Sequence, residues 1–357
     1  MADTHQPQRV ASDSPPAAPP EFTQLMDLAS ERLGGKALLA SDEFFAGKEN
    51  LLKPSRPIFV PDKYTDLGKW MDGWESRRKR TPGHDWCIIA LGRPGRVVGV
   101  NVDTAHFSGN QPETCTIEAA EMPDGTTATE MTALSVPWVE IIPHTALNPS
   151  SEHFIRVRPD AAARRFTHLR LNIFPDGGVA RLRVHGEVLP DWRAVAAANA
   201  DIDLAAAENA GLVIAANNMH FGSRHNLIMP GRAVNMGDGW ETRRKRGFKG
   251  GEFDWCIVRL GHRGVVSRIE VDTNHFKGNY PESCEIDVCD APAGGAFDPE
   301  SASWTTLLPR TRLSASTQHH YERELTALRS QPCTHVRLKI FPDGGVSRLR
   351  VWGRIRL

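Results

Sequence analysis

The 357-residue sequence lacks most of the features that assign a protein to a function class at first sight. Its 43 lysines and arginines balance 43 aspartates and glutamates, so it has none of the basic excess typical of nucleic-acid or membrane-surface binders. No run approaches the roughly 18 consecutive apolar residues of a membrane span. It also has no nucleophile elbow, phosphate-binding loop, dinucleotide fingerprint or Cys-x-x-Cys pair, which argues against the commonest hydrolases, kinases and dehydrogenases. We therefore expect no nucleic-acid partner and no membrane partner.

Residues 1–20 lack the apolar core of a secretion signal. They are rich in proline, alanine, serine and glutamine, a composition that predicts a disordered tail, and the default location is then the cytoplasm. In that reducing compartment the six cysteines should remain free thiols. Cys87, Cys115, Cys256 and Cys284 lie inside or beside strand-like runs, so we expect them to be buried and structural.

Three sequence blocks occur twice, in the same order. The first, DGWESRRKR at 72–80, returns as DGWETRRKR at 238–246. The second runs over 85–115 and returns over 254–284, and the third, FPDGGV, begins at 174 and again at 341. Solenoid repeats have periods of roughly 20 to 50 residues. The spacing here is far longer, so the chain is a tandem duplication in which each half should be a domain with its own core.

Within each half the apolar residues recur with a period of two. Val98, Val100 and Val102 alternate with more polar or smaller residues, and many such runs are separated by turn signals with little helix between them. This pattern predicts an all-β protein with an antiparallel β-sandwich in each half. The FPDGG segments are expected to turn one strand back onto the next as a hairpin.

The expected domain limits follow from the repeats. We predict a disordered tail over 1–20, a first sandwich over 21–187, an alanine-rich linker with a short helix over 188–212, and a second sandwich over 213–357. The spacing of Phe22, Leu25, Met26 and Leu33 predicts a further helix before the first repeat.

The first repeated block places carboxylates, an aromatic ring and guanidinium groups together. Its candidate substrate-binding or catalytic residues are Asp72, Trp74, Glu75, Arg77 and Arg78, with the second copies Asp238, Trp240, Glu241, Arg243 and Arg244. Guanidinium forks bind carboxylates in a bidentate way, so such a loop can hold an anion. Alternatively, the charges neutralise one another in a structural network and the tryptophan fills the core.

The second repeated block offers polar residues just beyond a strand end, where loops often carry function. They are Asp103, His106, Asn110 and Glu113, with the second copies Asp272, His275, Asn279 and Glu282. The Asp and His could act as general base and acid, could ligate a metal, or could simply cap a turn. No zinc spacing is present, and an oxygen-rich site suits manganese or magnesium better than zinc. In the third block Asp176 and Asp343 are expected to be turn residues.

Taken together, the DGWE(S/T)RRKR, DWC, VDT-x-HF-x-GN-x-PE and FPDGGV-x-RLRV segments resemble those of the allantoicase family over about residues 35 to 357. The resemblance implies two tandem antiparallel jelly-roll-like β-sandwich repeats and assembly into homo-oligomers. It also implies a hydrolase that acts on C–N bonds in linear amidines. Its reaction would be the hydrolysis of allantoate to ureidoglycolate and urea, a step of purine and allantoin catabolism.

The resemblance gives the candidate residues chemical roles. An arginine among Arg77, Arg78, Arg243 and Arg244 would anchor the substrate carboxylate. An acid among Glu75, Asp103 and His106, or Glu241, Asp272 and His275, would protonate the departing urea, and another group would activate water, directly or after urea has left. The remaining candidate residues would bind the ureido groups.

Three points stay open at this stage. One is which repeat carries the site. Another is whether a divalent metal, with manganese as the candidate, takes part. The third is function itself: the alternatives are a non-catalytic ligand-binding tandem β-sandwich and a related ureide hydrolase with a different substrate.

Overall fold

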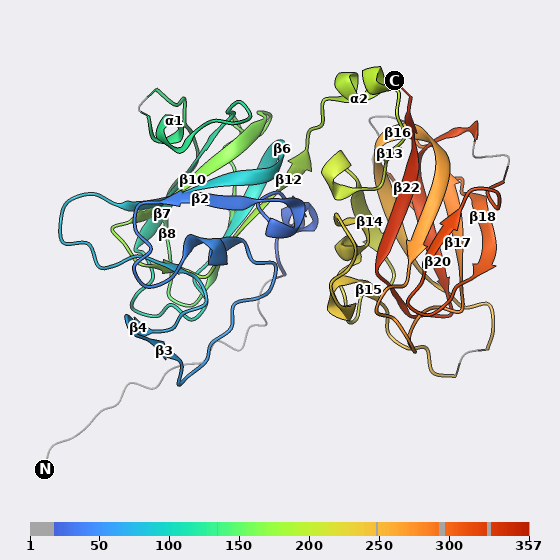
Figure 1. Cartoon of the computed structure of the whole chain (residues 1–357), viewed down its shortest axis with the longest axis horizontal. Coiled ribbons are helices and arrows are strands. Elements are labelled where there is room, and N and C mark those ends of the chain that lie inside the picture. Colours follow the sequence, from blue (N-terminus) through green and yellow to red (C-terminus); the bar gives the residue numbers. More distant parts are fainter. Residues whose placement is uncertain (1–17, 134, 248, 293–296, 327–329, 357) are drawn as a thin grey trace, which may run out of the picture.

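The computed structural model describes residues 18–133, 135–247, 249–292, 297–326 and 330–356. Two mostly β modules lie side by side, and a segment carrying a short helix connects them (Figure 1). Most of the predicted disordered tail, residues 1–17, falls outside the described residues.

The first module contains one large sheet in the order β1-β12-β6-β10-β7-β8, with β2 and β9 also paired to β6. The strands are β1 Met26–Asp27, β2 Lys36–Ala40, β6 Asp85–Asp103, β7 Thr114–Ala120, β8 Val139–Ala146, β9 Glu152–Arg156, β10 Phe166–Phe174 and β12 Arg181–Val188. Two small ladders join β3 Tyr64–Thr65 to β4 Gly68–Lys69 and β5 Trp74–Glu75 to β11 Gly178–Val179. The helical turns are η1 Glu21–Gln24, η2 Glu31–Leu33, η3 Lys48–Leu52 and α1 Ala128–Thr132.

The second module repeats this topology in the order β13-β22-β16-β20-β17-β18, with β14 and β19 paired to β16. Its strands are β13 Ile202–Asp203, β14 Leu212–Ala216, β16 Asp254–Asp272, β17 Ser283–Cys289, β18 Thr305–Arg312, β19 Gln318–Tyr321, β20 Pro332–Phe341 and β22 Arg348–Ile355, with β15 Trp240–Glu241 pairing β21 Gly345–Val346. The helical turns are η4 Ala207–Asn209, η5 Arg224–Ile228 and η6 Met236–Asp238. The strand pairs of both modules are antiparallel, which confirms the predicted fold class.

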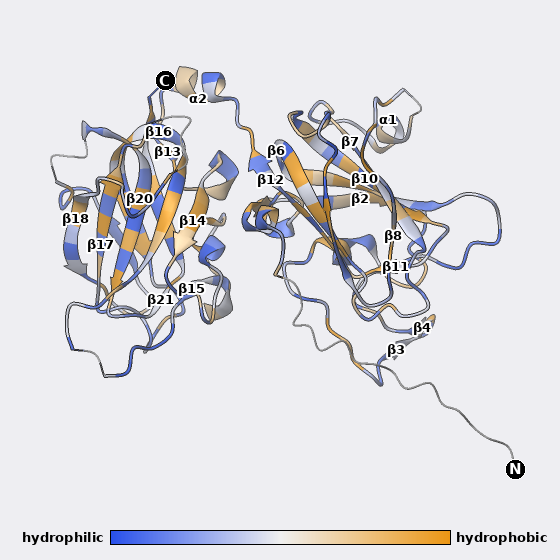
Figure 2. Cartoon of the chain, turned by 180° about the vertical axis from the view of Figure 1, so that it is seen from behind, coloured by the Kyte–Doolittle hydropathy of each residue, from blue (hydrophilic) through white to orange (hydrophobic). Residues whose placement is uncertain are grey.

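One long strand joins the two layers of each sandwich. The first part of β6 lies between β2 and β10, whereas its last five residues lie between β12 and β9. Hydrophobic residues, orange in Figure 2, are concentrated in the strands of both modules, and their buried side chains form the core. The strand β6 therefore belongs to both layers and holds them in register.

Two local predictions are wrong. The FPDGG segment does not close a hairpin, because β6 lies between β10 and β12 and the turn carries the chain from one layer to the other. The helix expected from Phe22 to Leu33 is replaced by η1, β1 and η2. Here the Asp27 carboxylate accepts hydrogen bonds from the amides of Ala29 and Val184, which fixes an extended segment against β12. The spacing of these apolar residues therefore reflects which side chains are buried and does not indicate a helix.

The linker helix exists but is short. It is α2 Trp192–Ala198, capped by the Asp191 carboxylate, which accepts the amides of Arg193 and Ala194, and ended by Asn199 in the left-handed conformation. Polar contacts also cross between the modules. Arg32 of η2 donates to the amide oxygen of Asn226 at 2.9 Å and pairs with the carboxylate of Asp238.

The cysteine prediction is confirmed. All six cysteines are free and buried. Burial raises the pKa of the Cys115 thiol to about 12, so the protonated form is kept at neutral pH and the thiol has little nucleophilic character. These cysteines pack the sheets and carry no chemistry of their own.

Candidate active site

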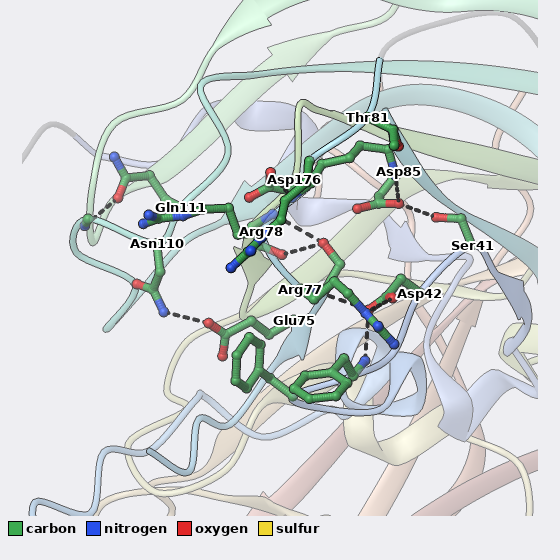
Figure 3. Close-up of a pocket in the computed structure, with 17 residues that line it drawn as sticks. Ser41, Asp42, Glu75, Arg77, Arg78, Thr81, Asp85, Asn110, Gln111 and Asp176 are labelled. Atoms are coloured by element: carbon green, nitrogen blue, oxygen red, sulfur yellow. Dashed lines mark hydrogen bonds and ion pairs between the residues drawn. The ribbon is translucent and has the colours of Figure 1, made fainter. Parts of the chain in front are cut away.

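The first module holds a cavity of about 850 Å³ where all three repeated blocks meet (Figure 3). Its walls come from the segment after β2, the DGWESRRKR block, the loop after β6 and the FPDGG turn. The lining residues are Ser41, Asp42, Phe44, Phe45, Glu75, Ser76, Arg77, Arg78, Lys79, Arg80, Thr81, Asp85, Gly109, Asn110, Gln111, Asp176 and Gly177.

Backbone hydrogen bonds hold these segments together. Glu75 pairs through its main chain with Ala46 on one side and Gly178 on the other. The Gly178 amide donates to the Asn110 carbonyl at 2.7 Å. A side chain at Gly178 would collide with the ring of Phe107, so only glycine permits this close approach. The loop that carries Asn110 is thereby fixed beside Glu75.

Glu75 is the carboxyl group of this cavity whose pKa is raised. Its side chain is buried, and Asn110 Nδ2 donates to Glu75 Oε1 at 2.8 Å. Burial raises the pKa of Glu75 above its ordinary value, and the hydrogen bond from Asn110 opposes this shift only in part. A carboxyl group of this kind keeps its proton to a higher pH, which suits a general acid.

Two arginines present guanidinium groups to the cavity in different ways. Arg77 Nε donates to Asp42 Oδ2 at 2.8 Å, and the guanidinium lies 4.6 Å from the centre of the Phe44 ring. Burial alone would raise the pKa of Asp42, but hydrogen bonds from the Arg77 and Phe44 amides and from the Arg77 side chain hold it below its ordinary value. Arg78 is exposed and has no side-chain partner in the described part of the chain. Its guanidinium is therefore available to an anion.

Another part of the cavity wall is a hydrogen-bonded network. Lys79 Nζ and Ser41 Oγ both donate to Asp85 Oδ1, at 2.6 and 2.8 Å. The Lys79 amide donates to Asp176 Oδ2 at 2.7 Å, so this aspartate orients the backbone of the cationic loop. Sequence reasoning missed Asp42, Asp85 and Ser41 as site residues, because the repeated blocks suggest no partner for them. Asp42, for example, is 35 positions from its partner Arg77.

A second, smaller chamber of about 370 Å³ lies on the other side of Glu75. Its lining residues are Phe45, Phe59, Lys69, Met71, Glu75, His106, Ser108 and Asn110. Glu75, Asn110 and Phe45 line both chambers. The buried carboxyl group therefore stands at the wall that the two chambers share.

The second chamber depends on a segment that only the first repeat has. The amides of Ile58 and Val234 make equivalent hydrogen bonds to Asp72 and Asp238, yet thirteen residues separate the first pair and three the second. The additional segment carries β3 and β4. Its Phe59 stacks on the His106 ring at 5.6 Å, so the two side chains together form one wall.

Four predicted residues of the first repeat line neither chamber. Asp72 forms a buried ion pair with Arg181 at 2.6 Å, and Trp74 is fully buried with its Nε1 donating to the Asp42 carbonyl at 2.9 Å. Asp103 caps the Ala105 amide at 2.7 Å, and burial raises its pKa. Glu113 is exposed. The residues brought together at the chambers are Glu75, Arg77, Arg78, His106 and Asn110.

The second repeat has an equivalent cavity of about 680 Å³. It brings together Glu241, Arg244, Asn279 and Glu282 of the predicted residues, and Asn279 Nδ2 donates to Glu241 Oε1 at 2.6 Å.

The other candidates of the second repeat have structural partners outside that cavity. Asp238 pairs with Arg348 at 2.9 Å, and Asp272 pairs with Arg232 at 2.9 Å. His275 Nε2 lies 2.9 Å from the Ala233 carbonyl. Trp240 Nε1 and the Arg243 amide both donate to Asn218. The tryptophan is fully buried, so in both repeats it fills the core.

The Asp and His of the second block do not form a metal-ligand pair. The Asp103 carboxylate bonds the Ala105 amide, whereas His106 Nε2 lies 3.3 Å from the Pro57 carbonyl. Over residues 18–356, apart from the undescribed positions, no three His, Cys, Asp or Glu side chains converge as a metal site would require. The side chains present therefore do not fit the manganese considered above. Among the same residues, no helix is long and apolar enough to cross a membrane.

Comparison with known proteins identifies the family. The model of the allantoicase repeat matches residues 26–189 and, a second time, residues 202–356. The chain belongs to the allantoicase family. It is 52% identical over 339 residues to probable allantoicase 1 of Burkholderia mallei, covering 94% of this chain and 96% of that protein. The probable allantoicase of Ralstonia nicotianae is 48% identical over 341 residues, covering 94% and 97%.

The fold of this allantoicase family member matches a solved relative. The crystal structure of allantoicase from Saccharomyces cerevisiae superposes with a TM-score of 0.78 at 35% identity, covering 93% of this chain and 96% of that one. The two tandem β modules are thus the allantoicase architecture, and the resemblance seen in the sequence is confirmed.

The geometry makes Asp72 a structural residue, and this can be tested. Asp72→Ala leaves the buried Arg181 without its counter-charge, so the free energy of unfolding should fall by about 3 kcal/mol. The control Glu113→Ala removes an exposed carboxylate and should change stability by less than about 0.5 kcal/mol. Urea denaturation measures both, and equal stability of the two variants would contradict the assignment.

Proposed function

We propose that this chain is an allantoicase that hydrolyses allantoate to ureidoglycolate and urea in the two chambers of its first repeat. The observation that carries the choice of site is the position of Glu75, a buried carboxyl group with a raised pKa at the wall between the chambers. The relatives of this chain named as probable allantoicases support the reaction.

The shape of the substrate suits this arrangement. Allantoate carries one carboxylate and two ureido arms on a single carbon. Arg78, whose guanidinium has no partner among the described residues, anchors the carboxylate in the larger chamber. The departing ureido arm lies beside Glu75, and the other arm enters the smaller chamber near Lys69 and His106.

The proposed reaction uses Glu75 twice. In its acid form it gives a proton to the nitrogen of the departing urea, and the electron pair of the breaking C–N bond leaves with that nitrogen. The other ureido nitrogen shares its lone pair with the central carbon, so a short-lived acyliminium ion forms. The Glu75 carboxylate then takes a proton from water as the water oxygen bonds to that carbon, which yields ureidoglycolate and restores the acid form.

Release of urea and ureidoglycolate from allantoate by the purified protein tests the reaction. Glu75→Gln should lower kcat by about 10²- to 10⁴-fold, because the amide cannot transfer the proton. The variant should remain folded, as its side chain keeps a similar shape. Absence of both products from the wild-type protein, with and without chelator and with added manganese, would contradict the function. Full turnover by the folded variant would contradict only the role of Glu75.

The pH dependence of turnover tests the acid role of Glu75. Since the protonated form is active, kcat/KM should fall as the pH rises through its raised pKa. Asn110→Ala removes a hydrogen bond that stabilises the carboxylate, so the pKa of Glu75 should rise further and the alkaline limb should move to higher pH. A limb that stays in place or moves to lower pH in Asn110→Ala would argue against this assignment.

Lys69 tests the second chamber. Its ammonium group lines the chamber, lies 4.9 Å from the Phe59 ring and also donates to the Pro61 carbonyl. Lys69→Gln should raise KM for allantoate about three- to tenfold with little change in kcat, as expected when a ground-state contact is lost. Lys63→Gln is the matched control, because Lys63 stacks on Trp70 in the same segment but lines neither chamber. Equal kinetics of the two variants would argue against a substrate contact.

We also propose the domain limits expected from the sequence, with modules over 21–187 and 213–357 and a linker over 188–212 that contains α2. A cytoplasmic location and a homo-oligomeric assembly belong to the same proposal. Exposed apolar side chains on one segment of the first repeat support assembly; they are Ile58, Phe59, Val60, Tyr64 and Leu67.

The particle mass in solution tests assembly. Light scattering should give a multiple of the 39.5 kDa chain mass. Leu67→Asp places a charge on this apolar segment and should shift the distribution toward the single chain. A wild-type protein of 39.5 kDa at micromolar concentration would contradict this proposal.

A further inference from the structure

The second repeat retains the part of the first site that holds an anion. Asn279 bonds Glu241 as Asn110 bonds Glu75, and Arg244 stands in the cavity wall at the position of Arg78. Like Arg78, Arg244 is exposed and has no side-chain partner among the described residues. The cavity thus presents a free guanidinium next to a carboxyl–amide pair.

One substitution removes a carboxylate from the segment that supports the second repeated block. Asn218 takes the place of Asp42: each side chain accepts the amide of the first arginine of its block at 3.0 Å, and each main-chain carbonyl accepts the indole of the buried tryptophan. Asp42 also neutralises the Arg77 guanidinium, whereas the amide of Asn218 carries no charge. The guanidinium of Arg243 therefore lacks the counter-ion that Arg77 has.

Arg312 adds a further cation to this cavity. Arg312 is the structural equivalent of Ala146. Each is the last residue of its strand, β18 or β8, and pairs with the first residue of the neighbouring strand, β17 or β7. The Arg312 side chain is 89% exposed, and its Nε lies 3.4 Å from Glu282. Because Glu282 also lines this cavity, its rim thus gains an ion pair that the first cavity lacks.

In the described part of the second repeat, the segment that lines the second chamber of the first repeat has no counterpart of similar length, however. The segment that supplies Phe59 and Lys69 in the first repeat is reduced to three residues between Val234 and Asp238. Glu241 is also less buried than Glu75. A ligand with a carboxylate and one ureido arm fits the features that remain, whereas the segment that lines the chamber proposed for the other ureido arm is missing.

We propose that the cavity of the second repeat is a non-catalytic binding site for a small ureido-carboxylate, such as allantoate or ureidoglycolate, with Arg244 as the anchor of the carboxylate. The proposal rests on the proposed function of the first repeat. Each chain then binds two ligands but converts only the one in the first repeat.

Calorimetric titration of allantoate into the Glu75→Gln protein tests this inference, because that variant should consume the ligand slowly enough for binding to be measured. Two sites per chain are expected, with urea formed no faster than the residual turnover of the variant. Adding Arg244→Ala to this variant should weaken one site about ten- to hundredfold, and adding Arg78→Ala should weaken the other. The two arginines are exposed and equivalent, so each variant is the matched control of the other. Titration of ureidoglycolate shows whether the product occupies the same second site.

The outcomes separate the two proposals. One site per chain that responds to Arg78→Ala and not to Arg244→Ala would overturn the second site and leave the proposed function intact. Retention of about half of the wild-type kcat in Glu75→Gln would show that the second repeat is catalytic and would also overturn it. Failure of the wild-type protein to form urea, with no binding at either site, would reject the proposed function itself.

Discussion

The buried ion pair between Asp72 and Arg181 sets the frame on which the candidate active site is built. Arg181 is only 1% exposed and donates to both the carboxylate and the main-chain carbonyl of Asp72. It thereby ties the DGWE block to the first residue of β12, directly after the FPDGG turn. Asp238 and Arg348 repeat the arrangement in the second module. Because a buried charge is costly without its partner, the two segments are held together, and Gly178, in its place in this turn, holds the Asn110 loop beside Glu75.

On this frame, opposing electrostatic environments lie within one cavity. Burial raises the pKa of the Glu75 carboxyl group, while the hydrogen bonds from Arg77 help to hold the pKa of Asp42 below its ordinary value. Two carboxyl groups of similar chemistry thus have pKa values shifted in opposite directions, and the one with the raised pKa is the better suited to donate a proton. The free guanidinium of Arg78 adds a place for a substrate anion. In the second repeat Asn218 replaces Asp42, so the same frame carries a different balance of charge.

The sequence was sufficient for the features that repeat. Its duplicated blocks and period-two pattern led to the β-sandwich repeats and to Glu75, Arg78 and Asn110 as candidate site residues. It was insufficient where partners are distant or have no counterpart. Asp42 pairs with Arg77 across 35 positions, and Lys69 belongs to a segment that the second repeat lacks, so internal comparison gave it no weight. The predicted hairpin was wrong for a related reason. The residues of a turn are a local signal, but the pairing of β10 and β12 with β6, which lies between them, depends on contacts that are distant in the sequence.

The contact of Arg32 with the second module has a consequence for how the chain can be divided. Asp238 belongs to the frame of the second repeat, yet its carboxylate receives one guanidinium from Arg348 within that repeat and another from Arg32 of the first. Asn226, which supports the same block by donating to the Gly239 carbonyl, also accepts from Arg32. Cutting the chain at its linker would remove one of the two cations beside a nearly buried carboxylate, so the second half should be less stable alone than within the whole chain. The frame of the second copy thus draws part of its charge balance from the first.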